Sequence, residues 1–329
     1  MKIFFHSYNG ANRFYKNILA AYFVIAALTI GVGRVQAQSA GGETYQEPKP
    51  KPAPASSTPV STHEADYMNQ ALQRVFRKAE AVTKVKDKLL AGYGFDQEGE
   101  CLWGAFLKVG QQITLDTTLE AGRSYFFVGA GDDFVTNLDI IITDTSGHIL
   151  GQDTEAGKEA GVLFKPKYNG GYKVLLRLKA GDRFGLCALA CLKRPGGWLL
   201  NHAEFTQTAN VFKTGVQSWW KSFKGGSFLH NGQWCLVMGV VQQGRTLTWS
   251  HTIPPGRLAL TTVQDGRARD LDLYLVNAND EVVTSDTTGG STPGFTYNSP
   301  GGGAYTWEIK AVSTTGPSLV GVALLELPR

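Results

Sequence analysis

The feature that most constrains the fold is an internal repeat. Displacing the 329-residue sequence by 133 positions aligns residues 137–177 with residues 270–310 without a gap, and eight of the 41 pairs are identical. The identical pairs are Leu138/Leu271, Asp139/Asp272, Asp153/Asp286, Thr154/Thr287, Gly157/Gly290, Gly161/Gly294, Gly170/Gly303 and Tyr172/Tyr305. With one additional residue in the second copy, Cys101-Leu102 falls on Cys235-Leu236. A long fixed offset of this kind indicates duplicated domains.

Each copy begins with a helical pattern that is followed by short strands. Apolar residues recur at helical spacing from Met68 to Leu89 and from Phe205 to Phe223. Apolar and polar residues then alternate between turns rich in Gly, Asn, Asp and Pro. Because short hairpins connect the strands, we expect a mainly β protein. It would consist of two tandem antiparallel β-sandwich or jelly-roll domains, each preceded by an amphipathic α-helix.

The first 37 residues have the features of a secretory signal peptide. Basic residues precede an uncharged run from Ile18 to Gly33, and small residues follow at the two positions that a signal peptidase reads, Val35 and Ala37. Cleavage near Ala37 is the favoured interpretation, and retention as an uncleaved anchor is the alternative. We therefore expect export to the periplasm or the extracellular space, with no membrane span after cleavage.

The remainder of the chain divides at changes of composition. Residues 38–60 form a Pro-rich linker, and the two copies span 61–197 and 198–329. The whole chain has 32 Lys and Arg against 28 Asp and Glu, and residues 1–37 hold four of these bases and no acid. Without that segment the balance is 28 against 28, so the charge does not favour a nucleic-acid partner.

The segment from Asp270 to Ala311 resembles a known family. It combines an acidic D-x-D-L-Y-L strand, a polar turn, a Ser/Asp-rich segment and a Pro-Gly…Tyr strand. These features are similar to the bacterial pre-peptidase C-terminal domain, a β-sandwich appended to many secreted peptidases. The first copy, from Asn137 onward, shows a degraded version of the pattern. The resemblance implies a non-catalytic domain that aids secretion, targeting or substrate binding.

Acidic residues at equivalent positions of the two copies form the best candidate metal site. They are Asp270, Asp272 and Asp286 in the second copy, and Asn137, Asp139 and Asp153 in the first. Alternate residues of a strand point to the same side, and calcium prefers several oxygen ligands, so calcium is a candidate cofactor. The favoured alternative is that these acids solvate the outer sheet face and accept hydrogen bonds from turn amides.

The four cysteines leave two interpretations open. An oxidising compartment permits disulfides, and Cys101 paired with Cys187 or Cys191 would link the first and last strands of one sandwich. Cys187 and Cys191 themselves would lie about 13 Å apart on one strand, which is too far for a bond between them. Buried free thiols are the alternative.

No catalytic residues are predicted. The sequence lacks H-E-x-x-H, G-x-S-x-G and P-loop motifs, and its histidines do not recur at equivalent positions. Among the aromatic residues, Trp220 lies off the helical stripe that contains Trp219, so we expect Trp220 on the surface, where it would contact a ligand.

The sequence therefore favours an exported, non-catalytic binding or adhesion-type protein. It would recognise a protein or polysaccharide at the cell envelope or outside the cell. One alternative is a secreted hydrolase, or a hydrolase accessory protein, with a site between the two copies. Another is a structural component of the envelope. The oligomeric state is not predicted.

Overall fold

The computed structural model describes residues 63–84, 92–96, 99–182, 184–195, 197, 201–230 and 232–328. The predicted signal peptide and Pro-rich linker lie outside these residues. The described chain is mainly β with antiparallel strand pairing, which confirms the predicted fold class.

The order of elements is the same in the two halves, except that the second has an additional two-residue strand, β9, after its helix. The first half contains α2 (Glu64–Lys84), β1 (Gly99–Lys108), β2 (Gln112–Leu119), β3 (Ser124–Gly131), β4 (Val135–Asp144), β5 (Ile149–Asp153), β6 (Glu159–Phe164), β7 (Gly170–Gly181) and β8 (Phe184–Arg194). The second contains α3 (His202–Ser222), β9 (Ser227–Phe228), β10 (Trp234–Val241), β11 (Thr246–Ile253), β12 (Gly256–Gln264), β13 (Ala268–Asn277), β14 (Val282–Asp286), β15 (Gly294–Ser299), β16 (Gly303–Thr314) and β17 (Ser318–Glu326).

The two halves share one sheet. Its order is β15-β12-β17-β10-β1-β8-β3-β6, and β9 pairs with β17 at the side. Each half also has a smaller sheet of its own, with the orders β2-β7-β4-β5 and β11-β16-β13-β14. Within the shared sheet, the first half contributes the order β1-β8-β3-β6 and the second half contributes β10-β17-β12-β15. These two orders correspond strand by strand, so the pairing is the same in both halves. The sequence predicts two sandwiches in tandem, and the structure joins them edge to edge.

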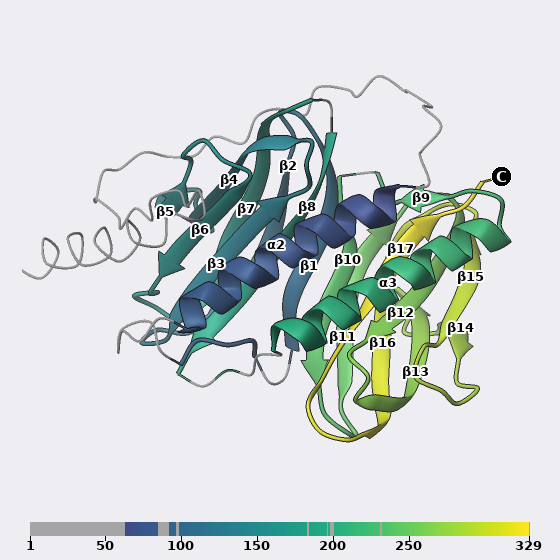
Figure 1. The fold of residues 1–329 in the computed structure, drawn as a ribbon. Coiled ribbons are helices and arrows are strands. Elements are labelled where there is room, and N and C mark those ends of the chain that lie inside the picture. The colour runs from purple at the N-terminus through teal and green to yellow at the C-terminus, as the bar shows by residue number, and fades with distance from the viewer. Residues whose placement is uncertain are drawn as a thin grey trace, which may run out of the picture.

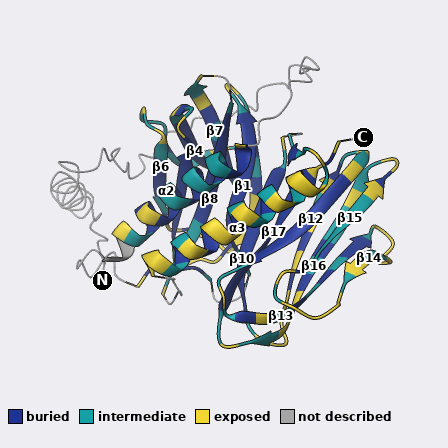
Figure 2. Ribbon diagram, turned by 45° about the vertical axis from the view of Figure 1, so that its right-hand side comes forward, coloured by how far each residue is buried: buried dark blue, intermediate teal, exposed yellow. Residues whose placement is uncertain are grey.

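The helices and the smaller sheets cover the shared sheet on both faces. The helices α2 and α3 lie side by side across it, with α2 against β3 and β8 and α3 against β12 (Figure 1). The rings of Phe76 and Phe205 stack between the helices at 3.9 Å. Because both faces are covered, the central strand β10 is buried along its length (Figure 2).

Most of the predicted helical stripe is confirmed, but its end is not. Phe205, Ala209, Phe212 and Val216 are buried, and the next buried residue is Trp220 rather than Trp219. Trp220 is only 3% exposed and packs edge-on against Phe228 at 5.7 Å. The prediction that Trp220 lies on the surface is therefore wrong. The four-residue step from Val216 keeps Trp220 on the face of α3 that meets the sheet.

The junction between the halves is the antiparallel pair β1–β10, which has approximate two-fold symmetry. Trp103 pairs with Val237, and these two residues occupy equivalent positions of the two copies. Gly104 pairs with Leu236, the equivalent of Leu102. A contact in which each copy uses the same strand against its counterpart is isologous, as in a two-fold dimer. The junction therefore resembles a dimer interface formed within one chain.

Candidate functional site

The repeated acids at the ends of β5 and β14 hold turn amides. Asp153 accepts a hydrogen bond from the amide of Gly161 at 2.8 Å, and Asp286 accepts one from Gly294 at 2.9 Å. In each copy the second carboxylate oxygen accepts from the amide two residues further on, at 3.3 and 3.2 Å. Burial raises the pKa of Asp153. Partial burial opposes ionisation of Asp286 as well, but hydrogen bonds from Gly294 and Thr288 lower its pKa overall.

The acids on the central strands of the smaller sheets have different partners. Asp139 is fully buried and forms an ion pair with Arg177, the residue opposite it on β7. Asn137 is half-buried near the start of the same strand. Asp139 is therefore engaged by a neighbouring strand of its own sheet. This contact fits the structural role that was the alternative to calcium binding.

In the second copy, Asp270 accepts from the amide of Gly290 at 3.0 Å, and Asp272 accepts from the hydroxyl of Tyr274 at 3.0 Å. Among the described residues, no three His, Cys, Asp or Glu side chains are placed to hold one metal ion. Calcium binding stays a prediction, and the contacts of the five acids favour a structural role for them, whereas the side-chain oxygen of Asn137 and one carboxylate oxygen of Asp139 are buried without a hydrogen-bond partner.

A second pair of repeated acids, Asp132 and Asp265, was not predicted from the sequence. Asp132 accepts hydrogen bonds from the amides of Phe134 and Leu186, both at 2.9 Å. Asp265 accepts hydrogen bonds from the amides of Arg267 and Leu319, at 3.0 and 3.1 Å, and these residues are the equivalents of Phe134 and Leu186 at the displacement of 133 positions. Each acid ties a turn to the last strand of its half. The signal was present, because Asp132 falls on Asp265 at the offset of the repeat.

The repeated cysteines form two β-bulges at the junction. The register of β1 against β10 shifts between Glu100 and Leu102, so Cys101 is an extra residue on β1. It shifts again where Gly104 and Ala105 face Leu236 and Trp234, so Cys235 is the extra residue on β10. Both side chains are buried free thiols. A bulge changes the direction in which the neighbouring side chains point.

The strand register distinguishes the two predicted disulfide partners of Cys101. Cys187 lies opposite Ala105 on β1, whereas the pair Leu102–Ala190 places Cys101 opposite Cys191 when it is continued by one residue. Cys187 is then about 13 Å along the strand from that position, which is beyond the reach of a disulfide. The predicted alternative of a Cys101–Cys187 disulfide is therefore wrong. Burial raises the pKa of Cys101, and the nearby Cys191 raises it further. A Cys101–Cys191 disulfide stays a prediction, since all four thiols are free in the structure.

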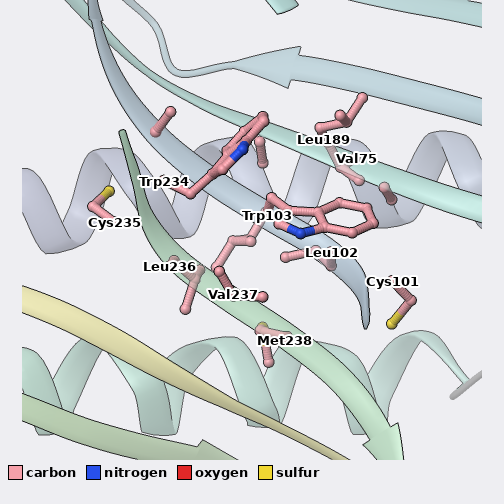
Figure 3. Packing of buried hydrophobic residues seen from close by; sticks show 14 of the residues in the cluster. Val75, Cys101, Leu102, Trp103, Leu189, Trp234, Cys235, Leu236, Val237 and Met238 are labelled. Carbon is pink, nitrogen blue, oxygen red and sulfur yellow. The ribbon is translucent and has the colours of Figure 1, made fainter. Parts of the chain in front are cut away.

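The bulge at Cys101 brings Glu100 and Trp103 to the same side of β1. Residues three apart in a regular strand face opposite sides. The extra residue at Cys101 shifts the alternation by one, so the side chains of Glu100 and Trp103 face the same side. The indole nitrogen of Trp103 donates a hydrogen bond to the carboxylate of Glu100 at 3.1 Å. In the second half, Trp234 takes the position equivalent to Glu100 and donates to the carbonyl oxygen of Thr114 at 3.3 Å. Figure 3 shows the indoles of Trp103 and Trp234 near each other, with ring centres 6.4 Å apart.

A cleft of about 570 Å³ opens on this side of the junction. We call it the junction cleft. Glu100 and Trp103 of β1 line it together with residues 115–120 at the end of β2 and 246–248 at the start of β11. Cys191 and Lys193 at the end of β8 also line it, as do Asp96, Gly99, Tyr125, Phe127 and Val240. Its volume is within the range of clefts that bind small molecules or side chains.

The carboxyl groups give the junction cleft its chemical character. Burial raises the pKa of Glu100 to about 7, although the hydrogen bond from Trp103 opposes the shift. Near neutral pH the group is therefore present in both forms and can accept or donate a hydrogen bond. Asp116 is an exposed carboxylate on the wall. The lysine on the wall, Lys193, is paired with Asp96.

The opposite end of the junction has a different content. Trp234 is 8% exposed, so an indole fills the space that corresponds to Glu100. His251 of β11 lies beside it. Burial lowers the pKa of His251 to about 4, although a hydrogen bond with the Trp234 backbone opposes this shift. This side chain is therefore neutral at physiological pH. The two ends share a backbone design and differ in whether an acid or an indole projects from it.

The helices α2 and α3 are too polar to serve as membrane spans, and the part of the chain that the structure describes holds no helix that is both long and apolar enough to cross a bilayer.

No protein-family model and no curated protein matches the sequence. Among solved structures, the PBSX exported protein XepA is similar over 71% of this chain and 89% of its own, with 10% identity and a TM-score of 0.22. A conserved protein of unknown function from Pseudomonas aeruginosa PAO1, PA5104, covers 70% of this chain and 84% of its own at 9% identity and a TM-score of 0.18. A Pleurotus ostreatus lectin in complex with GalNAc covers 71% and 80% at 12% identity and a TM-score of 0.20. At these TM-scores the likenesses carry no argument about function.

Proposed function

We propose that the protein is an exported, non-catalytic binding protein whose ligand, a protein or polysaccharide at the cell envelope or outside the cell, enters the junction cleft. The observation that carries this proposal is the bulge at Cys101, which turns Glu100 toward Trp103 on the cleft side of β1. Trp103 is only 4% exposed, so its indole orients Glu100 by a hydrogen bond, and the carboxyl groups of Glu100 and Asp116 are left to make directional hydrogen bonds to a ligand.

The energetic cost of Glu100 supports a binding role. A carboxyl group whose pKa is raised by burial destabilises the fold when it ionises. The equivalent position holds Trp234, so the scaffold accepts an apolar residue there. Perturbed carboxyl groups in clefts are concentrated at functional sites. A costly acid at one end of a symmetric junction is therefore best explained by a ligand.

The sequence supports export and the absence of catalysis independently of the cleft. Residues 1–37 have the pattern of a signal peptide. The resemblance of residues 270–311 to the pre-peptidase C-terminal domain implies a domain that targets or binds rather than one that catalyses.

A secreted hydrolase is the second candidate, and the pKa of Glu100 favours it. A carboxyl group with a pKa of about 7 is suited to general acid catalysis. Asp116 on the wall of the same cleft would be the second carboxylate. This candidate predicts turnover of a bound ligand that Glu100→Gln abolishes, whereas the binding proposal predicts that the ligand is released unchanged.

Binding to arrays of peptides and oligosaccharides tests the proposal. Three full-length proteins are compared: the wild type, Glu100→Trp, which copies the filled end, and Val109→Trp, which adds the same side chain at an exposed position of the β1–β2 turn. We expect Glu100→Trp to weaken binding by about tenfold or more and Val109→Trp to bind as the wild type. Equal binding by Glu100→Trp, or no binding by the wild type to either array, would contradict the proposal. The second result would favour a structural envelope component.

A further inference from the structure

We propose that the ligand of the junction cleft is an extended polypeptide that adds as a strand to the free edge of β2 and places a basic side chain against Glu100 and Asp116. This inference rests on the proposed function and specifies its ligand.

The hydrogen-bond pattern of β2 identifies the backbone groups that are available. The amide of Leu178 on β7 donates to the carbonyl of Gln111 at 3.0 Å, which makes these two residues a hydrogen-bonded pair. Hydrogen-bonded and non-hydrogen-bonded pairs alternate in an antiparallel ladder. Asp116–Lys173 and Thr118–Gly171 are therefore non-hydrogen-bonded pairs. The N–H and C=O groups of Asp116 and Thr118 point away from β7, toward the cleft.

Two further contacts support this assignment. Thr114 belongs to the same alternate set, and its carbonyl accepts the indole N–H of Trp234 from the junction side. On the opposite wall, the amide of Ala311 donates to the carbonyl of Arg245. By the same alternation, Thr246 and Thr248 direct their backbone groups away from β16. The cleft therefore lies between two strand edges with outward-pointing peptide groups.

These two edges differ from the other sheet edges in the described part of the molecule. The edge strands β5 and β14 have five residues each, and β6 and β15 have six. The edge strands β2 and β11 have eight residues each, QITLDTTL and TLTWSHTI, and, like the shorter edge strands, they contain neither Lys nor Pro. Short length is one of the usual protections against strand addition. The two longest of these edge strands are the ones that face the cleft.

The charge of the cleft selects the kind of polypeptide. Glu100 and Asp116 present carboxyl groups, while Lys193 is neutralised by Asp96 and Glu120 by Arg123. An added strand alternates its side chains between its two faces. A Lys or Arg on the face that meets β1 would reach Glu100 and pair with its carboxyl group. A polysaccharide would use the side chains of the cleft without needing the strand edge.

Backbone methylation of the ligand tests this pairing. The probe is a set of nine-residue synthetic peptides in which Lys alternates with Thr or Val, offered to the full-length protein. For the best binder, N-methyl groups are placed on one alternate set of amides or on the other. Strand addition predicts that methylation of at least one set weakens binding by about tenfold or more, because a methylated amide cannot join the ladder. Binding that is unchanged by methylation of either set would overturn the inference.

A backbone variant of the protein provides the matched test. Thr118→Pro removes the outward N–H, which edge strands tolerate because that group is not used within the sheet. Thr118→Ala removes the side chain and keeps the N–H. We expect Thr118→Pro to weaken peptide binding by about tenfold and Thr118→Ala by less than about twofold. Equal effects of the two variants, at an unchanged melting temperature, would overturn the inference.

The same experiment separates the failure of this inference from that of the proposed function. If oligosaccharides bind, peptides do not, and Glu100→Trp removes the binding, the cleft is a binding site for another class of ligand and only the strand-addition inference fails. If neither class binds, the proposed function and the inference fail together.

Discussion

The two ends of the junction have the same construction and different contents. At one end, the bulge at Cys101 directs Glu100 into an open cleft, and at the other, the bulge at Cys235 directs Trp234 into a packed space. The strands, the register and the bulges are related by an approximate two-fold axis. The two ends differ in side chains on this common backbone: Glu100 and Thr117 line the open end, whereas their equivalents Trp234 and His251 lie at the filled end. A departure from the internal symmetry is therefore a better guide to function than the symmetry itself.

The features that both halves retain have structural explanations. Asp153 and Asp286 hold equivalent turn amides, and Asp132 and Asp265 tie equivalent turns to the last strands. Asp153 and Asp132 satisfy buried amides of Gly161 and Leu186, and their equivalents in the second half satisfy part-buried ones.

The largest effect is expected at the filled end. Trp234→Ala removes a buried indole that packs against Trp103 and donates to Thr114, so we expect the free energy of unfolding to fall by about 3–5 kcal/mol in urea. Tyr168→Ala is the control, because this ring is 75% exposed and its loss costs less than about 0.5 kcal/mol. A loss below about 1 kcal/mol for Trp234→Ala would show that the indole does not fill the space.

The pH dependence of stability should have opposite signs at the two ends. The pKa of Glu100 is raised to about 7 from 4.5, so its contribution is present below about pH 4.5 and is lost as the pH rises to 7. The pKa of His251 is lowered to about 4 from 6.5, so its contribution is present above pH 6.5 and is lost as the pH falls to 4. Each contribution should be about 1–3 kcal/mol after allowance for partial solvation.

Urea unfolding at pH 4, 5.5 and 7 measures both slopes. With Glu100→Gln, stability should rise more steeply with pH than in the wild type, because the opposing contribution of Glu100 is removed. With His251→Asn, stability should fall more steeply with pH than in the wild type, because the opposing contribution of His251 is removed. Parallel pH profiles for the wild type and the two variants would contradict the assignment of these groups to buried environments.

The equivalent acids should be of similar but unequal importance. Asp153→Ala leaves the buried amide of Gly161 without its acceptor, whereas Asp286→Ala affects the part-buried amide of Gly294. We expect losses of about 2 and 1 kcal/mol respectively, measured by urea unfolding. A larger loss for Asp286→Ala would mean that the turn of the second half has an additional role.

The smallest effect concerns calcium. Since Asp139 pairs with Arg177 and Asp286 holds turn amides, we expect millimolar calcium to leave the melting temperature unchanged. An upward shift that Asp286→Ala removes would instead support the calcium site predicted from the sequence.

Local patterns in the sequence predict the elements of each half well. The alternation at Leu271, Leu273 and Leu275 identifies a strand with one buried face, and all three residues are buried in β13. The stripe from Phe205 to Val216 is also correct. It fails at Trp220 because two adjacent tryptophans fit nearly the same helical position, and only the packing against Phe228 distinguishes them.

The shared sheet and the cleft depend on contacts between distant segments. The continuous apolar run of Trp234–Val241 is consistent with a strand covered on both faces, but nothing in it shows that β1 is the neighbour. The alignment of Cys101 with Cys235 marks both bulges, and it places Glu100 opposite Trp234 in the comparison of copies. That contrast becomes informative only once the register shows that both side chains face the junction.

Amide hydrogen exchange on the full-length protein, with and without the best-binding peptide, distinguishes the open end from the filled end. We expect slower exchange at the amides of Asp116 and Thr118 in the open end when the peptide is present. At their equivalents in the filled end, Ser250 and Thr252, we expect no change. Protection at Ser250 and Thr252 instead, or at neither pair, would contradict binding at the open end.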